Sequence, residues 1–367
     1  MRENILLLFC GGTISMRSEE DGVLDTTHDD DHKQMLRFAP RIEDLANIDI
    51  KFIINEDSSD MDKEVWEKVT DVIQAEYDNY DGFVITTGTD TMAYMSSALS
   101  FSLQGLGKPV AITGAQIPVE EIRTDARINL INVVLVSCMN LAGVFVVFGD
   151  KIILGPRAKK VSDIALNAFG TSNQEDFGTT TKVFTDIELL HPTKYKRHNG
   201  KPSFKNGFND NIACIHNVPG LNNKYIEGLI DGGIEGIVFK TFGTGNLPEV
   251  LFPSLKKAYE KKIPVIIATQ CNEGTTVMNK YSLGKKATDL GVIEAYDMSI
   301  EAASTKLMWM LDQCIPFADF KEVFQTNIVG ELDKKIADCI MGHKDKTTGE
   351  LLEDLIKVKG KKLNDIR

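Results

Sequence analysis

Three short turns in the first third of the chain carry residue types that could perform covalent chemistry. Each turn follows an apolar run, and they read Gly11-Gly12-Thr13, Thr87-Gly88-Thr89-Asp90-Thr91 and Gly114-Ala115-Gln116. A threonine hydroxyl is a weak nucleophile at neutral pH, so it needs a neighbouring base. No histidine lies near these turns in the sequence, which argues against a Ser-His-Asp arrangement.

The adjacent Lys159 and Lys160 follow another apolar run and offer an alternative base. A lysine can act as a base when burial or a second cation lowers its pKa enough to leave a neutral amine. The paired glycines before Thr13 allow the backbone to approach a ligand closely, and their N–H groups could face a developing oxyanion. The residue types in these turns, together with the two lysines, therefore suit attack by a hydroxyl on a small polar substrate.

The same turns also have a purely structural interpretation. Taken alone, a Gly-Gly-Thr turn after a strand is most often only a turn, and Thr89 or Asp90 could simply cap a helix. None of the turns has the spacing of a phosphate-binding loop. Several such turns at strand ends in one chain make a chance occurrence less attractive.

The elements that must position these turns are short, continuous apolar runs separated by segments with helical periodicity. Runs of this kind are typical of strands covered on both faces of a parallel sheet, and they cover 5–10, 82–86, 109–113, 143–148, 234–239 and 264–268. Helices are expected over 62–77, 91–103 and 125–139, the last capped by Thr124 or Asp125. The sequence therefore predicts an α/β fold in which the turns meet at the carboxyl edge of a parallel sheet.

The length of 367 residues favours two domains. A polar stretch with two prolines and many asparagines marks the predicted boundary. We expect a catalytic α/β domain over 1–188, a linker over 189–211, a smaller α/β domain over 212–332 and a charged helical extension over 333–367.

The net charge of −12 predicts repulsion from nucleic acid and from anionic lipid. No secretory leader and no apolar stretch long enough to span a membrane are found in the sequence, so we expect a cytoplasmic protein. Six scattered cysteines without a C-x-x-C pair are typical of reduced thiols. His28 and His32 bracket three aspartates, but we expect this segment to be exposed and to hold no metal.

Taken together, the motifs resemble those of the L-asparaginases, over about residues 4 to 332. FCGGTISM and VITTGTDTMAYMSSALSF resemble the two family signatures, and DSSDM, AITGAQIP, GPRAKKVSDIALNAF, HNVPG, FGTGNLP and ATQCNEG resemble further segments of the bacterial type I branch. The resemblance implies an asparaginase/glutaminase-like fold, with a larger N-terminal parallel-sheet domain and a smaller C-terminal α/β domain. It implies hydrolysis of L-asparagine to L-aspartate and ammonia through a threonine acyl-enzyme, without cofactor or metal.

The resemblance also implies residue roles. Thr13 matches the nucleophile, and Thr89, Asp90 and Lys160 match a second triad in which the lysine helps to activate a threonine. Asp90 also matches the carboxylate that binds the substrate α-ammonium group, and Ser58 the hydroxyl that binds its α-carboxylate. The remaining pocket residues are Asp57, Ser59, Gly88, Ala115 and Gln116.

The family further implies a homodimer or homotetramer, with Asn246 and Glu301 as candidates for contacts with a neighbouring subunit. Type I enzymes bind asparagine at a regulatory site, where Cys271 matches but Lys240 and Lys159 replace an arginine and a threonine. These two differences argue against regulation by asparagine.

Val23 stands where the family commonly has a tyrosine, in a flap over 17–33 that would close over the site. An asparagine sensor without turnover is therefore one alternative function. The ammonia-producing subunit of a tRNA-dependent amidotransferase is another. Minor glutaminase activity fits all enzyme interpretations, because one methylene changes pocket discrimination by only about 1–3 kcal/mol.

Overall fold

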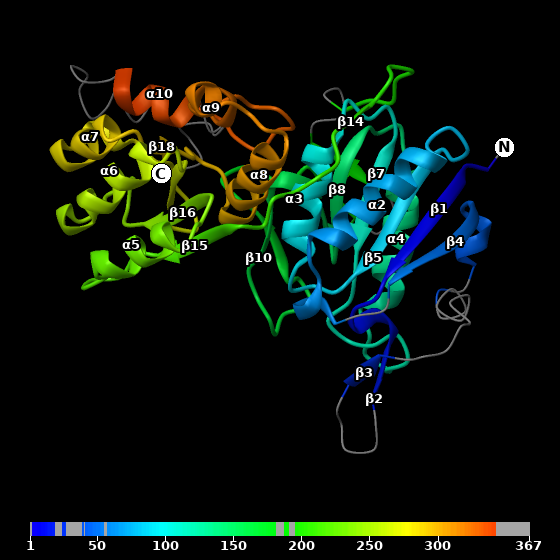
Figure 1. The fold of residues 1–367 in the computed structure, drawn as a ribbon. Helices are drawn as coiled ribbons and strands as arrows, with labels where there is room; N and C mark the ends of the chain where they lie inside the picture. Colours follow the sequence, from blue (N-terminus) through cyan, green and yellow to red (C-terminus); the bar gives the residue numbers. More distant parts are fainter. Residues whose placement is uncertain are drawn as a thin grey trace, which may run out of the picture. The chain divides into compact units, whose positions relative to one another are not determined.

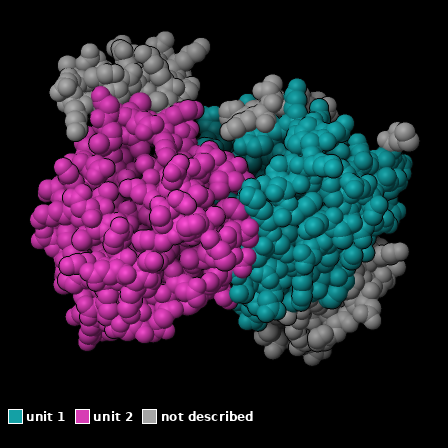
Figure 2. Space-filling model, turned by 45° about the horizontal axis from the view of Figure 1, so that its top comes forward, with its two compact units in different colours: residues 1–208 teal, residues 209–367 magenta. Residues whose placement is uncertain are grey.

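The computed structural model describes residues 2–18, 24–26, 39, 41–54, 57–180, 187–190 and 195–342. The chain divides into two compact units, Met1–Phe208 and Asn209–Arg367 (Figure 2). Val23, His28, His32 and the segment 343–367 of the predicted extension lie outside the described residues.

The first unit is built on an eight-stranded sheet, counted over the described residues, in the order β13-β12-β9-β8-β7-β5-β1-β4 (Figure 1). The strands are β1 Asn4–Cys10, β4 Asn47–Ile54, β5 Gly82–Thr87, β7 Pro109–Thr113, β8 Gly143–Phe148, β9 Lys151–Leu154, β12 Gly178–Thr179 and β13 Glu188–Leu189. Neighbouring strands from β4 to β8 are parallel, whereas β9, β12 and β13 pair antiparallel. The predicted α/β fold with a parallel-rich N-terminal sheet is confirmed.

Three helices connect the parallel strands: α2 Lys63–Glu76, α3 Met92–Ser102 and α4 Ala126–Cys138. Helix α4 packs Leu130, Val133 and Val134 against one face of the sheet, in a cluster that includes Phe145 of β8. Helix α3 is buried over nearly its whole circumference, and Ser96 and Ser100 donate their hydroxyls to helix carbonyls. Sheet faces covered by helices explain why β1, β5 and β7 are continuous apolar runs.

Shorter elements complete this unit. They are η1 Thr13–Ser15, β2 Met16–Ser18, β3 Leu24–Thr26, η2 Ile42–Asp44, η3 Ser58–Asp60, β6 Leu103–Gln104, η4 Gly155–Arg157, β10 Ala158–Lys160, β11 Phe169–Thr171 and β14 Ser203–Phe204.

Part of the segment expected as a linker over 189–211 folds onto the first unit. Strand β14 pairs antiparallel with β6. The Arg197 guanidinium donates to the carbonyl oxygens of Met139, Asp81 and Ser137. These contacts explain why the first compact unit extends to Phe208.

The second unit has a parallel sheet in the order β15-β16-β17-β18. Its strands are β15 Ile212–His216, β16 Gly236–Thr241, β17 Val265–Thr269 and β18 Ile293–Glu294. Its helices are α5 Asn223–Asp231, α6 Phe252–Glu260, α7 Ser282–Asp289, α8 Ile300–Asp312, α9 Phe317–Phe324 and α10 Lys335–Gly342, with η5 Glu249–Leu251 and η6 Met278–Lys280. Over the described ranges, no helix is both long and apolar enough to cross a bilayer.

Candidate active site

The three polar turns leave the carboxyl ends of neighbouring strands β1, β5 and β7 in close backbone contact. A β-carbon on Gly12 would lie 2.3 Å from the Gly88 amide nitrogen, and one on Gly114 would lie 2.3 Å from the Thr87 carbonyl oxygen. A β-carbon on Gly88 would lie 2.2 Å from the Ser58 β-carbon. Glycine is therefore required at each crossing, because any side chain would separate the turns.

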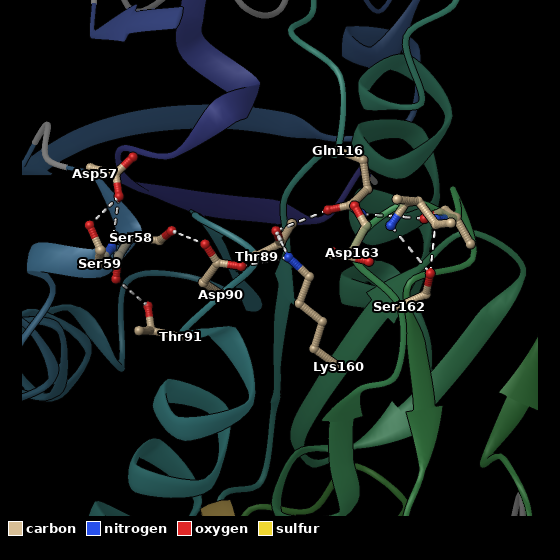
Figure 3. Close-up of polar contacts among 12 residues, drawn as sticks. Asp57, Ser58, Ser59, Thr89, Asp90, Thr91, Gln116, Lys160, Ser162 and Asp163 are labelled. Carbon is tan, nitrogen blue, oxygen red and sulfur yellow. Dashed lines mark hydrogen bonds and ion pairs between the residues drawn. The ribbon is translucent and has the colours of Figure 1, made fainter.

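Lys160 and Thr89 meet in the middle of this edge (Figure 3). Lys160 ends β10, and its Nζ lies 2.8 Å from the Thr89 hydroxyl oxygen and 2.6 Å from Asp90 Oδ1. The Lys160 side chain is 19% exposed, whereas the Asp90 side chain is 65% exposed. The Lys160 side chain is therefore mostly buried, whereas the Asp90 carboxylate also faces solvent, where a ligand could reach it.

Gln116 is a second side chain that contacts the Thr89 hydroxyl. Thr89 Oγ1 donates to Gln116 Oε1 at 3.0 Å. Gln116 Nε2 donates to the carbonyl oxygens of Asp163 at 3.0 Å and Ala165 at 3.4 Å. The side chain therefore bridges the turn after β7 and the loop after β10.

Ser58 joins Asp90 from η3, with its hydroxyl 3.4 Å from Asp90 Oδ2. Thr91 anchors this arrangement, because its hydroxyl donates to the Ser58 carbonyl at 3.0 Å. Asp57 caps η3, accepting the Ser59 hydroxyl at 2.6 Å and the Ser59 N–H at 2.8 Å. These two hydrogen bonds, the hydroxyl first, lower the pKa of the Asp57 carboxyl.

Thr13 opens η1 directly after Gly12, so the contact of Gly12 with Gly88 places it beside the Thr89 turn. Its side chain is partly exposed. Ala115, directly before Gln116, is fully buried. The geometry thus gathers Ser58, Thr89, Asp90, Gln116 and Lys160 by direct contacts.

The remaining candidates lie in the second unit. Lys240 is on β16, Cys271 follows β17 and donates its N–H to the Thr269 hydroxyl, and Asn246 bridges to Phe242. Glu301 is buried in the first turn of α8, and its Oε2 has no hydrogen-bond partner among the described residues.

Sequence reasoning missed the residues that support Gln116. Asp125 was expected only as a possible helix cap, yet the Thr124 hydroxyl accepts the Ala126 N–H of α4 while the Asp125 carboxylate turns back to the Gln116 backbone. Asn129, one helical turn later, was not singled out. Its signal in the sequence was a polar residue among apolar ones in a predicted helix.

A metal centre was not expected, and no group of three or more His, Cys, Asp or Glu side chains suited to a metal occurs within the described ranges. All six cysteines are free.

The structure thus combines two α/β units with a lysine, two hydroxyls and a carboxylate at the carboxyl edge of the larger sheet, groups that suit a small polar ligand. Comparison with known proteins makes the class specific. The chain belongs to the asparaginase family: residues 4–192 match the model "Asparaginase, N-terminal" and residues 211–324 match "Glutaminase/Asparaginase C-terminal domain". The resemblance found in the motifs is confirmed.

The relatives include proteins named L-asparaginase and proteins named as subunits of an amidotransferase. An L-asparaginase of Thermococcus kodakarensis is 35% identical over 332 residues, 89% of this chain and 98% of that protein. The crystal structure of L-asparaginase I from Vibrio cholerae is similar with a TM-score of 0.81 and 33% identity, covering 91% of this chain and 100% of that one. A glutamyl-tRNA(Gln) amidotransferase subunit from Thermococcus kodakarensis is 32% identical over 337 residues, 90% of this chain and 76% of that protein.

Proposed function

We propose that this protein hydrolyses L-asparagine to L-aspartate and ammonia. The observation that carries the proposal is the position of Lys160 Nζ, 2.8 Å from the Thr89 hydroxyl oxygen and 2.6 Å from Asp90 Oδ1. A hydroxyl within hydrogen-bonding reach of a lysine that a carboxylate orients is an arrangement typical of covalent catalysis by a threonine. Relatives named L-asparaginase over nearly the full chain support the same reaction.

The proposed reaction is acyl transfer in two steps. The Thr13 oxygen attacks the side-chain carboxamide carbon, and the hydroxyl proton leaves toward Lys160, the proposed base. The C–N bond then breaks as the nitrogen takes a proton and departs as ammonia. Water then attacks the ester and restores the threonine hydroxyl. Hydroxyl, base and water supply every atom and proton that the reaction consumes, so the proposal needs no cofactor.

Substrate recognition follows from the charges of the same residues. The exposed Asp90 carboxylate would hold the α-ammonium group, and the Ser58 hydroxyl beside it would donate to the α-carboxylate. The flanking positions are Asp57, Ser59, Gly88, Ala115 and Gln116. Such a pocket rejects amides that lack an amino acid head, because its polar groups would lose their partners.

The test is ammonia release from asparagine and from glutamine by wild type, Thr13→Ala and Lys160→Met. We expect wild type to prefer asparagine and each variant to lose activity by at least about 100-fold, the scale of a lost nucleophile or base. Calorimetry that detects asparagine binding to a folded wild type that forms no product would instead select a sensor.

The amidotransferase relatives support a second candidate, an ammonia-supplying subunit. The same assay separates the two functions, because an ammonia-supplying subunit should prefer glutamine. This candidate would be established if the isolated wild type were inactive on asparagine and gained glutaminase activity when its partner subunit and tRNA were added.

We also propose a cytoplasmic homodimer or homotetramer. Free cysteines are compatible with a reducing compartment. The loop after Lys160 exposes Val161, Ile164 and Leu166, and an exposed apolar segment of this kind favours contact with another copy of the chain. Sedimentation of wild type and Ile164→Asp tests the assembly, and a monomeric wild type would contradict it.

A further inference from the structure

We propose that Asp125 and Asn129 are positioning residues that hold Gln116 as the acceptor of the Thr89 hydroxyl hydrogen. The inference rests on the proposed function, because it assigns a role in turnover to groups outside the pocket. Three links carry it: Asp125 to the Gln116 backbone, Asn129 to two neighbouring turns, and the Gln116 side chain to Thr89.

The Asp125 carboxylate is surrounded by hydrogen-bond donors. It accepts the Gln116 N–H at 3.1 and 3.0 Å, the Ile117 N–H at 3.0 Å and the Asn129 amide at 3.1 Å. Asp125 is only 6% exposed, and a buried carboxylate is tolerated only where several donors face it. Asp125 precedes α4, but its carboxylate makes no capping hydrogen bond to the helix backbone, and the Thr124 hydroxyl accepts the Ala126 N–H instead.

Asn129 extends the network to the ends of two strands. Its Nδ2 donates to the Gly114 carbonyl at 3.0 Å, in the turn after β7. Its Oδ1 accepts the Gly149 N–H at 3.0 Å, directly after β8. Asn129 thus ties Gly114, at the start of the turn after β7, to the residue that follows β8. Asp125 holds the backbone of Gln116, at the end of the same turn.

The direction of the Gln116 side-chain amide follows from its partners. Nε2 faces the carbonyl oxygens of Asp163 and Ala165, so the reverse orientation would set oxygen against oxygen. Oε1 must therefore face the Thr89 hydroxyl, which has one hydrogen and gives it to Gln116. A lone pair of the same hydroxyl is left to meet Lys160 Nζ at 2.8 Å.

Gln116 consequently sets the rotation of the Thr89 hydroxyl relative to Lys160, and Asp125 sets the place of Gln116. A shift of this loop would leave the substrate contacts of Ser58 and Asp90 in place, because those residues belong to other turns. The expected defect is therefore in kcat and not in KM.

The experiment is a double-mutant cycle of Asp125→Asn and Gln116→Ala, with kcat and KM for asparagine. Asparagine keeps the size of Asp125 but sets an N–H₂ group against N–H donors. We expect Asp125→Asn to lower kcat about 10- to 100-fold with KM changed less than about threefold, a size common for groups that orient an active residue. In the Gln116→Ala background it should cause no further loss, because the network acts through Gln116.

Thr113→Val is the matched control. Thr113 is fully buried and lies three residues before Gln116. The substitution keeps the shape of the side chain and removes the hydrogen bond from the Thr113 hydroxyl to the Val147 carbonyl at 2.7 Å. We expect it to lower the melting temperature while leaving kcat within about twofold of wild type. A kcat loss for Asp125→Asn that is equal in both Gln116 backgrounds, or a folded Asp125→Asn with wild-type kcat, overturns the proposal.

Two further measurements cover the remaining cases. If Asp125→Asn does not fold, Asn129→Ser, which removes one donor to the carboxylate, takes its place in the cycle with the same expectation. Amide hydrogen exchange of Gln116 and Ile117 gives a readout that needs no turnover. An inactive wild type would reject the proposed function. Loss of amide protection in Asp125→Asn, with protection kept in Thr113→Val, would still support the positioning network. Unchanged protection in Asp125→Asn would reject the network.

Discussion

The Gly12 backbone packs against the backbone of Gly88 so closely that a β-carbon on Gly12 would lie 2.3 Å from the Gly88 amide nitrogen. Gly12 also has φ +91°, a conformation that residues with a side chain rarely adopt. The turn that carries Thr13 and the turn that carries Thr89 are thus joined at a contact that only glycine allows.

Gly12→Ala should separate the two turns and reduce asparagine turnover by at least about 100-fold, the effect expected for a shift of about 1 Å between reacting groups. It should also lower the free energy of unfolding by at least about 1–3 kcal/mol, because the φ value alone is strained. Steady-state kinetics and urea denaturation measure the two effects. Gly228→Ala in α5 is the control: no atom lies within 4 Å of its added β-carbon, so we expect unchanged kinetics and a small gain in stability. Wild-type activity in Gly12→Ala would show that the turns need not touch.

Ser58→Ala should raise KM for asparagine more than it lowers kcat. The Ser58 hydroxyl lies 3.4 Å from Asp90 Oδ2, and in the proposed function it donates to the substrate α-carboxylate. A lost hydrogen bond to a charged group costs about 1.5–3 kcal/mol, which corresponds to a roughly 10- to 150-fold rise in KM. Ser137→Ala in α4, whose hydroxyl donates to the Val134 carbonyl of its own helix, serves as the control. A loss confined to kcat would place Ser58 with the reacting groups instead of the substrate head.

The sequence predicted the central strands closely, since β7 and β8 coincide with the expected runs 109–113 and 143–148. These strands are buried on both faces, so apolar residues fill them almost without interruption. Strand β4 was not predicted, because exposed polar residues alternate with its apolar ones along an edge of the sheet. The antiparallel pairing of β9, β12 and β13 was not predicted either, since strand direction depends on connections that composition does not record.

The site divides in the same way. The proximity of Thr89, Asp90 and Lys160 could be predicted, because polar residues that follow strands converge at one edge of a parallel sheet. The motif T-G-T-D-T-M singled out Thr89 and Asp90, and the segment GPRAKKVSDIALNAF singled out Lys160. The contact of Gln116 with the Asp163 carbonyl spans 47 positions and involves a backbone atom, so no residue type signals it. The Asp125 carboxylate was assigned to the nearest helix end, whereas the structure directs it to the loop before that helix.

The second unit contains a fully buried ion pair between Lys306 and Glu331. Lys306 Nζ lies 2.5 Å from Glu331 Oε1, and neither side chain is exposed. The Glu331 carboxylate also accepts the backbone N–H groups of Ile328 and Val329, which holds the loop before it against α8. Burial lowers the pKa of Lys306, an effect that Glu331 opposes.

Lys306→Met should lower the free energy of unfolding by about 3–5 kcal/mol, because it leaves a buried carboxylate without its cation. Adding Glu331→Gln should recover part of this loss, since the charge disappears while an acceptor for Ile328 remains. Lys286→Met is the control: its pair with Glu249 is 2.7 Å long but 61% and 57% exposed, so we expect a change below about 1 kcal/mol. Denaturant unfolding measures all three, and equal losses for the buried and exposed pairs would contradict the argument.

Glu294 should make the second unit less stable as the pH rises. Burial raises the pKa of its carboxyl, although the Met278 N–H, which donates to Oε1 at 2.6 Å, and the charge of Lys321 oppose the shift. A carboxyl whose folded-state pKa exceeds the unfolded value binds its proton more tightly in the folded protein, so its stabilising contribution is complete below the unfolded pKa and is lost as pH rises through the folded pKa. Glu294→Gln keeps an acceptor for the Met278 N–H and removes the titration. We expect the free energy of unfolding, measured by urea titration from pH 4 upward, to fall less with pH in Glu294→Gln than in wild type, so that the variant gains relative stability toward neutral pH. An identical pH dependence for both proteins would show that the Glu294 carboxyl titrates alike in the folded and unfolded chain.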